Sequence, residues 1–311
     1  MIPETFLSTD GKSNVHVKTW PVDNPKAVLQ IAHGMSEYIE RYGAFAEYLN
    51  ANGIAVVGHD HIGHGRSSDR KDYGYFGEKD GWLNFASDVQ KMFEITKAEY
   101  PDIPYFMMGH SMGSFIVRTW FGKHCRDIDG VIFMGTAGAN PALGAGKSIV
   151  SVLRKLKGDR HISKLITAMA FGSYNKHIPD AKTHHDWLTR DDAVIAEYVK
   201  DPACGFTFSL AGYADLFNLL TYINSDRWYK DIPKDIPVLL VAGDDDPVGS
   251  YGKGPSEVAG KMEDAGCEDI SLLLYEGMRH EILNEFGKEA VMEDIKKFIL
   301  DEECEGTADT E

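Results

Sequence analysis

The chain has 311 residues, long enough for one large domain or for one domain that carries a sizeable insertion. Its hydrophobic fraction of 43% and charged fraction of 26% are ordinary for a globular protein and argue against disorder of the whole chain. The net charge of −16 argues against a nucleic-acid binder, because proteins that grip a phosphate backbone carry a basic surface.

The start of the chain and the spacing of the cysteines indicate the cellular compartment of the protein. The first twenty residues have neither a cationic start nor an apolar core, so they do not resemble a signal peptide, and no apolar run is long enough to span a bilayer. The four cysteines lie far apart without a Cys-x-x-Cys pair, which favours a reducing compartment over a disulfide framework or a zinc site. We therefore expect a cytoplasmic protein without a metal site.

Short apolar runs alternate with amphipathic stretches, a pattern that predicts an α/β protein with a mostly parallel central sheet flanked by helices. Strands at 5–8 and 15–20 around the turn at Asp10-Gly11 predict an initial hairpin. Buried strands are predicted at 28–32, 54–58, 105–108, 131–134, 237–242 and 271–275. Helices are predicted at 39–51, 83–100, 114–123, 256–265 and 289–300.

The alternation of strands and helices stops after Met134. From 136 to 229 no convincing buried strand occurs, and apolar residues repeat at helical spacing. We predict that 136–229 form a helical cap inserted into a core made of residues 1–135 and 230–300. The final segment, 301–311, holds six acidic residues and no basic one, which predicts a disordered tail.

The strongest local signal is the sequence Gly-His-Ser-Met-Gly at residues 109–113. It follows an apolar run and precedes a helical stretch, the context of the G-x-S-x-G nucleophile elbow. The glycines allow a sharp turn that exposes the hydroxyl of Ser111, and the positive end of the following helix faces developing negative charge. We expect Ser111 to be a nucleophile, the alternative being an ordinary serine in a glycine-flanked turn.

A serine nucleophile needs a positioned base, and with this elbow the partners follow in the order Ser, Asp/Glu, His. Strand 237–242 runs into three aspartates at 244–246, and strand 271–275 leads to His280. Both segments lie past strand ends, where open α/β sheets place their active sites. The positions of the three aspartates alone do not show which of them would orient the histidine. The alternative for the three aspartates is a solvated turn or a cation site. The alternative for His280 is an ordinary exposed loop residue.

The reaction also needs donors for the oxyanion. The backbone amide of Met112, the residue after the nucleophile, is one predicted donor. The strand at 28–32 ends in His-Gly-Met-Ser-Glu at 33–37, which makes the amide of Met35 the second. We expect His33, with Gly34 and Glu37, to support this loop; acting as a catalytic base is the alternative for His33.

Four ordered motifs resemble the monoacylglycerol lipase and lysophospholipase group of α/β-hydrolases, within the serine aminopeptidase S33 type. They are residues 33–37, Asp-His-Ile-Gly-His-Gly-Arg-Ser at 60–67, the elbow at 109–113, and Gly-Asp-Asp-Asp-Pro-Val at 243–248 with His280. The resemblance runs from about residue 10 to residue 300. It implies the α/β-hydrolase fold, Asp246 as the triad acid and Met35 as an oxyanion donor. It also implies that 60–67 is mainly a structural turn, so His61 and His64 have no chemical role.

These residues predict a serine hydrolase that cleaves carboxylic esters. His280 would take the proton of Ser111 as the hydroxyl attacks the ester carbonyl, while Asp246 holds the imidazole. We expect no cofactor. The resemblance favours a small ester substrate that is lipid-like, a monoacylglycerol or a lysophospholipid. Apolar cap residues offer surface for an acyl chain, although packing of the cap is the simpler expectation for most of them.

Two other functions stay open. A serine aminopeptidase or amidase would use the same triad and bind the substrate amine with a cap carboxylate, for which Asp186, Asp191, Asp192 and Glu197 are available. A non-catalytic binding protein of the same fold would lack a triad member, and here all three are present.

The cap segment 147–164 reverses the acidic balance of the chain. It holds six basic residues against one acid, which predicts transient contact with an anionic membrane surface, the alternative being a solvated helix face. The sequence leaves open the acyl length, the alcohol, ester against amide preference, cap mobility, the acyl acceptor and the oligomeric state.

Overall fold

The computed structural model describes residues 1–125 and 127–301. All but the first residue of the predicted tail at 301–311 therefore lies outside the described residues. Within the described residues, no helix is both long and apolar enough to cross a membrane.

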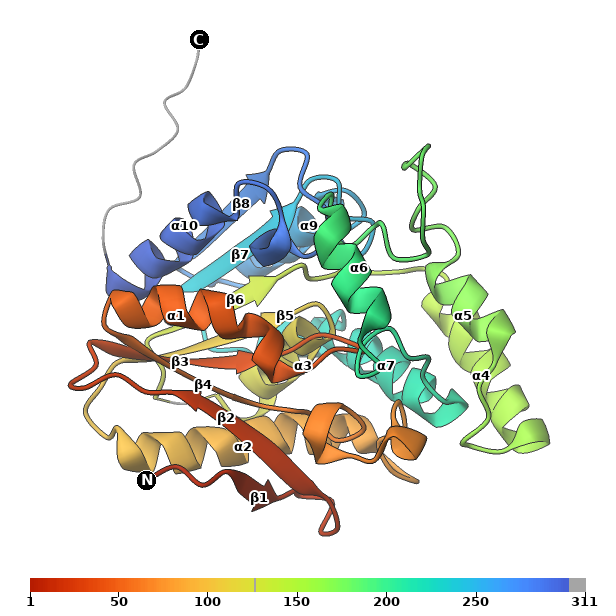
Figure 1. Cartoon of the computed structure of the whole chain (residues 1–311), viewed down its shortest axis with the longest axis horizontal. Helices are drawn as coiled ribbons and strands as arrows, with labels where there is room; N and C mark the ends of the chain where they lie inside the picture. Colours follow the sequence, from red (N-terminus) through yellow and green to blue (C-terminus); the bar gives the residue numbers. More distant parts are fainter. Residues whose placement is uncertain (126, 302–311) are drawn as a thin grey trace.

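A single sheet of eight strands runs through the molecule in the order β1-β2-β4-β3-β5-β6-β7-β8 (Figure 1). Its strands are β1 (Thr5–Leu7), β2 (Asn14–Trp20), β3 (Ala27–Ala32), β4 (Ile54–His59), β5 (Tyr105–His110), β6 (Gly130–Met134), β7 (Val238–Gly243) and β8 (Ile270–Tyr275). β1 and β2 pair antiparallel, and β3 to β8 run parallel. The predicted mostly parallel sheet is confirmed.

Both faces of the sheet are covered, which explains the continuous apolar runs in the sequence. On β3, Val28 and Ala32 belong to one core cluster, and Leu29 and Ile31 belong to the other. Helices α1 (Gly43–Ala51) and α10 (Lys288–Leu300) pack on the second cluster, and α2 (Gly81–Glu99), α3 (Met112–Lys123) and α9 (Lys253–Asp264) pack on the first (Figure 1). Short 3-10 turns lie at η1 (Ile39–Tyr42), η2 (Gly65–Ser67), η3 (Arg70–Asp72) and η4 (Ile282–Asn284).

Two elements differ from their predicted form. The predicted helix at 39–51 is a 3-10 turn, η1, followed by α1; Arg41 on η1 enters a buried network described below. Strand β8 is only partly buried, and Leu274 on it is 43% exposed. It is the edge strand and pairs with β7 alone, so its apolar run does not mark a fully buried strand.

Five helices separate β6 from β7. They are α4 (Leu143–Lys157), α5 (Lys164–Phe171), α6 (Asp192–Lys200), α7 (Leu210–Ile223) and α8 (Asp226–Asp231). The first four lie beyond the carboxyl ends of the parallel strands (Figure 1). In α8, the indole of Trp228 donates a hydrogen bond of 2.6 Å to the carbonyl of Arg118 on α3. The predicted cap boundary at 229 therefore falls inside a helix that packs on the core. The division into core and cap stays a prediction.

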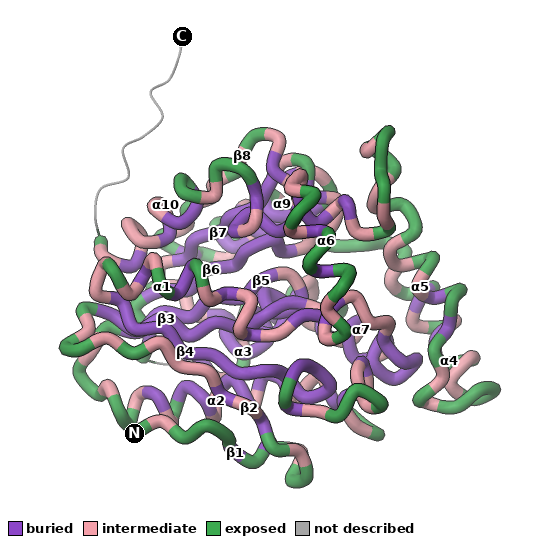
Figure 2. The backbone as a smooth tube through the Cα atoms, in the orientation of Figure 1, coloured by how far each residue is buried: buried purple, intermediate pink, exposed green. Residues whose placement is uncertain are grey.

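The inserted helices are attached unevenly. In α7, Leu210, Tyr213 and Leu219 are fully buried against the core. In contrast, α5 buries only Ile166, and α4 and α5 are largely exposed or half-buried along their lengths (Figure 2). Their exposed apolar side chains are Val152, Leu156, Leu165 and Met169.

Candidate active site

The turn between β5 and α3 places Ser111 at the start of the helix in a strained conformation. Its φ of 53° lies in the left-handed region. A Cβ on Gly109 would lie 2.3 Å from the carbonyl oxygen of Gly113, and a Cβ on Gly113 would lie 2.0 Å from that of Ala32. Both motif glycines are therefore required by close backbone contacts, and α3 can rest directly on the end of β3.

His280 and Asp246 meet at the carboxyl ends of β7 and β8. The Nδ1 atom of His280 lies 2.9 Å from Oδ2 of Asp246, and both side chains are buried. The other carboxylate oxygen of Asp246 accepts the amide of Val248 at 2.8 Å. This pairing fixes which ring nitrogen carries the proton, because a carboxylate can only accept. It leaves Nε2 as the basic nitrogen.

Ser111 is connected to this pair through its neighbour His110. The ring of His110, the residue before Ser111, is 4.8 Å from that of His280 between centroids, and its Nε2 is 3.3 Å from the carbonyl oxygen of His280. Neither the hydroxyl of Ser111 nor Nε2 of His280 has a hydrogen-bond partner among the described residues. Such contacts commonly tighten only when substrate is bound.

The loop after β3 approaches the nucleophile closely. An added Cβ on Gly34 would lie 3.3 Å from Cβ of Ser111. Ser36 adopts a φ of 55°, which turns the chain back toward the site. No described residue accepts a hydrogen bond from the amide of Met35 or of Met112. Both predicted oxyanion donors are therefore without an acceptor among the described residues.

His33 supports this loop in the structure. Its Nδ1 lies 2.8 Å from the carbonyl oxygen of Gly34, and its Nε2 accepts the amide of His61 at 3.0 Å. Both ring nitrogens are used in these contacts. Burial lowers the pKa of His33, so the ring is neutral at physiological pH.

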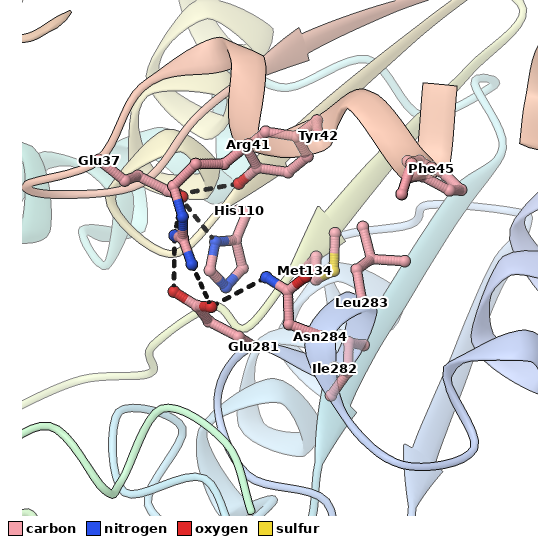
Figure 3. A pocket seen from close by; sticks show the side chains of 11 residues that line it. Glu37, Arg41, Tyr42, Phe45, His110, Met134, Glu281, Ile282, Leu283 and Asn284 are labelled. Carbon is pink, nitrogen blue, oxygen red and sulfur yellow. Dashed lines mark hydrogen bonds and ion pairs between the residues drawn. The ribbon is translucent and has the colours of Figure 1, made fainter. Parts of the chain in front are cut away.

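A buried ionic network, which sequence reasoning missed apart from Glu37, joins the three loops of the site (Figure 3). The carboxylate of Glu37 accepts the amide of Gly34 and a guanidinium hydrogen of Arg41, both at 2.5 Å, and lies 3.3 Å from Nδ1 of His110. Arg41 in turn makes a bidentate pair with Glu281 at 2.8 and 2.7 Å. The network thus links the loop after β3, the elbow and the loop that carries His280.

Charges within the network compensate for its burial. Burial would raise the pKa of Glu37, but the Arg41 guanidinium and the contact with His110 outweigh it and hold the pKa below its usual value. Burial opposes protonation of His110, yet Glu37 raises its pKa above the ordinary value. The i,i+4 spacing of Glu37 and Arg41 was a weak sequence signal for one pair. No sequence signal connects Arg41 with Glu281, 240 residues away.

Within residues 1–125 and 127–301, no group of three or more His, Cys, Asp or Glu side chains is placed to hold a metal ion. The site brings together a serine hydroxyl, an imidazole oriented by a carboxylate, and two backbone amides, the groups that a serine hydrolase uses. Those roles remain predictions.

The sheet order, the elbow and the strand-end histidine and aspartate define an α/β-hydrolase. The chain belongs to the family described as serine aminopeptidase, S33, whose model matches residues 23–287. It is 29% identical to a monoglyceride lipase homolog of Monkeypox virus, covering 92% of this chain and 94% of that one. It is 26% identical to a monoacylglycerol lipase of Mycolicibacterium smegmatis, covering 95% and 96%.

Among solved structures, the chain resembles a thermostable carboxyl esterase from Bacillus coagulans in complex with glycerol. The TM-score is 0.89 at 31% identity, over 95% of this chain and 96% of that one. These comparisons confirm the predicted resemblance to monoacylglycerol lipases, the fold and the enzyme class, a carboxylic ester hydrolase.

Proposed function

We propose that the chain hydrolyses monoacylglycerol-like or lysophospholipid-like esters through an acyl-enzyme on Ser111. The observation that carries the proposal is the buried pair of His280 and Asp246, 2.9 Å apart, at the same sheet edge as a strained serine. A buried carboxylate that holds an imidazole beside a serine is the arrangement that activates a hydroxyl for acyl transfer.

In the proposed cycle, Nε2 of His280 accepts the hydroxyl proton as Oγ of Ser111 bonds to the ester carbonyl carbon. The amides of Met35 and Met112 donate to the carbonyl oxygen as it becomes negative, each contributing about 3 kcal/mol. The tetrahedral intermediate collapses, the alcohol takes the proton from His280, and an acyl-serine remains. Water, deprotonated by His280, attacks the acyl carbon, and Ser111 leaves with the proton returned to it.

A lipid-like substrate is supported by apolar surroundings of the base. The indole of Trp187 lies 5.1 Å from the His280 ring between centroids, and Tyr174 lies 4.9 Å from Trp187. Phe171 contacts both aromatic rings. An aromatic wall suits a hydrocarbon chain better than a charged substrate. The names of the relatives described above support the same substrate class.

The test is hydrolysis of 1-monoacylglycerol, a lysophospholipid and p-nitrophenyl esters of increasing acyl length by wild type and by Ser111→Ala. We expect turnover that persists with long acyl chains and disappears in Ser111→Ala. Turnover of acetate and butyrate alone would contradict the lipid-like substrate. Equal activity of the two proteins would contradict the role of Ser111.

An aminopeptidase activity is suggested by the description of the family, but three of the four cap carboxylates available for it have other partners. Asp186 accepts the backbone amides of Lys182 and Thr183, and Asp191 accepts that of Ala193. Asp192 pairs with the Lys182 side chain. Preferential hydrolysis of an aminoacyl-anilide would favour this activity. Labelling of folded protein by a fluorophosphonate separates both enzymatic functions from a non-catalytic binding protein, which would not react at Ser111.

We also propose transient contact of α4 and α5 with an anionic lipid surface. Leu156 and Leu165 are 75% and 56% exposed on these helices, and Lys155, Lys157 and Lys164 are their neighbours in the sequence. Apolar side chains can enter the interface while cations meet anionic headgroups. We expect sedimentation with anionic vesicles that weakens with salt. Leu156→Ser with Leu165→Ser should reduce it, whereas Leu7→Ser, an exposed apolar site on β1, should not. Equal binding to neutral vesicles would contradict the proposal.

A cytoplasmic location completes the proposal. Cys204 and Cys267 are buried thiols outside any disulfide, as suits a reducing compartment. Cell fractionation tests it, and recovery of the protein mainly outside the cytoplasm would contradict it.

A further inference from the structure

One segment of the insertion, residues 186–206, contacts two separate loops of the site. It contains α6, and Trp187 and Gly205 lie near its two ends. At each end, the contacts are made with backbone groups of the core, which belong to different loops and lie more than 200 residues apart in sequence. Side-chain packing alone would not fix the backbone of these loops so directly.

The first end holds the loop that carries His280. The amide of His280 donates to the carbonyl of Trp187 at 3.4 Å, and the amide of Glu281 donates to that of Leu188 at 2.7 Å. The guanidinium of Arg279 donates to the carbonyls of Asp186 and Thr189 at 2.7 and 3.1 Å. These hydrogen bonds fix the position of the loop relative to the carboxyl ends of the strands.

The indole of Trp187 adds a contact with the base itself. Its ring lies 5.1 Å from that of His280, on which His110 packs at 4.8 Å. The imidazole thus contacts a residue of the insertion and a residue of the elbow. With Nδ1 held by Asp246, this packing limits rotation of the ring and fixes the direction of Nε2.

The second end holds the loop of the predicted oxyanion donor Met35. The carbonyl of Ser36 accepts the amide of Gly205 at 3.0 Å and the hydroxyl of Tyr198 at 3.1 Å. The hydroxyl of Ser36 donates to the carbonyl of Phe206 at 2.6 Å. Ser36 has a positive φ, a conformation that persists only where its surroundings enforce it. Here the enforcing contacts come from the insertion.

We propose that residues 186–206 position the base and the oxyanion loop relative to Ser111, with Trp187 and Tyr198 as positioning residues. The inference rests on the proposed function. Misplacement of a reacting group by about 1 Å can cost about a hundredfold in rate. The segment therefore acts on the chemical step, independently of what it contributes to binding the acyl chain.

Tyr198→Phe tests the oxyanion end with a minimal change. It removes the hydroxyl that donates to Ser36 and keeps the ring that packs on the Arg41 guanidinium at 5.0 Å. The matched control is Tyr213→Phe, which removes a buried hydroxyl bonded at 3.1 Å to Thr167 inside the insertion. We expect kcat to fall about fivefold in Tyr198→Phe, the loss typical of one hydrogen bond, with KM unchanged and with full activity in the control.

Trp187→Leu and Trp187→Phe test the end that holds the base. We expect kcat of the leucine variant to fall on the order of tenfold, equally for acetate and for long-chain p-nitrophenyl esters. Phenylalanine keeps an aromatic face against His280 and should restore most of the rate. Trp82→Leu, a half-buried tryptophan on α2, is the control for general loss of packing.

Several outcomes would overturn the inference. A loss confined to long-chain esters, or a rise in KM alone, would make these residues part of the substrate site. Unchanged kcat in folded variants, verified by melting temperature, would make the contacts merely structural. The labelling rate of Ser111 by a fluorophosphonate gives the same comparison without an ester substrate. Failure of the proposed function is a separate result, seen as inert wild type or active Ser111→Ala.

Discussion

Three aspartates follow β7 in succession, and their side chains have three different environments. Asp244 accepts the amide of Gly277 at 2.6 Å, Asp245 is exposed, and Asp246 is buried against His280. The three residues are identical in type, and only the path of the loop gives their side chains different surroundings. The sequence predicted Asp246 through family resemblance, because the direction of each side chain depends on contacts with residues of the neighbouring loop.

Asp246→Asn should preserve the fold and nearly abolish activity. An amide at this position can donate to Nδ1, which would move the imidazole proton to Nε2 and remove the base. We expect kcat to fall about 10⁴-fold, measured with a p-nitrophenyl ester. Asp245→Asn is the control and should retain wild-type activity. A loss below tenfold for Asp246→Asn would contradict the role of the carboxylate.

The guanidinium of Arg41 lies between two buried carboxylates, so its removal should destabilise the protein strongly. Arg41→Met leaves Glu37 and Glu281 facing each other without their guanidinium, at a cost of about 3 kcal/mol in the free energy of unfolding. Urea denaturation measures it. Arg227→Met, which breaks an exposed i,i+4 pair with Asp231, should change stability by less than about 0.5 kcal/mol.

At the scale of elements, the sheet and its covering helices could be predicted because strands buried on both faces and amphipathic helices have distinct periodicities. The arrangement of the inserted helices could not be predicted. Phe208, Leu210 and Leu219 are buried, whereas Met169 is 50% exposed, although all four are equally apolar in sequence. Which face of such a helix is covered depends on its neighbours, and helical spacing does not identify them.

Helix glycines provide a test of how the elements pack. Gly260 lies inside α9 with nothing within 4 Å of an added Cβ. Gly260→Ala should therefore raise the free energy of unfolding by about 0.8 kcal/mol, because alanine loses less backbone entropy in a helix. The contrasting variant is Gly113→Ala. Its Cβ would collide with the end of β3, so we expect this substitution to prevent folding or to abolish activity. Thermal and urea unfolding compare them. Destabilisation by Gly260→Ala would contradict the open space around it.

On the scale of the whole molecule, four buried histidines, His33, His59, His61 and His64, contact one another where β3 and β4 end. Burial lowers the pKa of His59 and of His64 to about 3. Neither ring nitrogen of His59 has a hydrogen-bond partner among the described residues. The native protein thus keeps these rings neutral over a pH range in which the unfolded chain binds protons.

Stability should therefore fall on acidification. The unfolded chain protonates near the ordinary histidine pKa of 6.5, and the native rings protonate only near pH 3. The free energy of unfolding rises with pH wherever the unfolded state binds more protons, so it should fall by about 2 kcal/mol per ring for His59 and His64 between pH 7 and pH 5. Urea titrations at both pH values measure the change.

His59→Leu should weaken that pH dependence, because it removes one of the rings that the native state cannot protonate. His184→Leu, at an exposed position, is the matched control. A pH dependence identical in wild type and His59→Leu would show that other groups cause the acid sensitivity.

The uneven attachment of the inserted helices has a consequence for how such enzymes diverge. Residues 143–171, which form α4 and α5, make few buried contacts with the core, whereas residues 186–206 hydrogen-bond to the backbone of two core loops. In recombination between relatives, α4 forms a cassette that can be exchanged without disturbing the loops around Ser111, whereas α5 carries Phe171, which contacts Trp187. A crossover inside 186–206 would break those hydrogen bonds. Descendants can therefore change the exposed face of α4 while they inherit the same hydrogen bonds around Ser111.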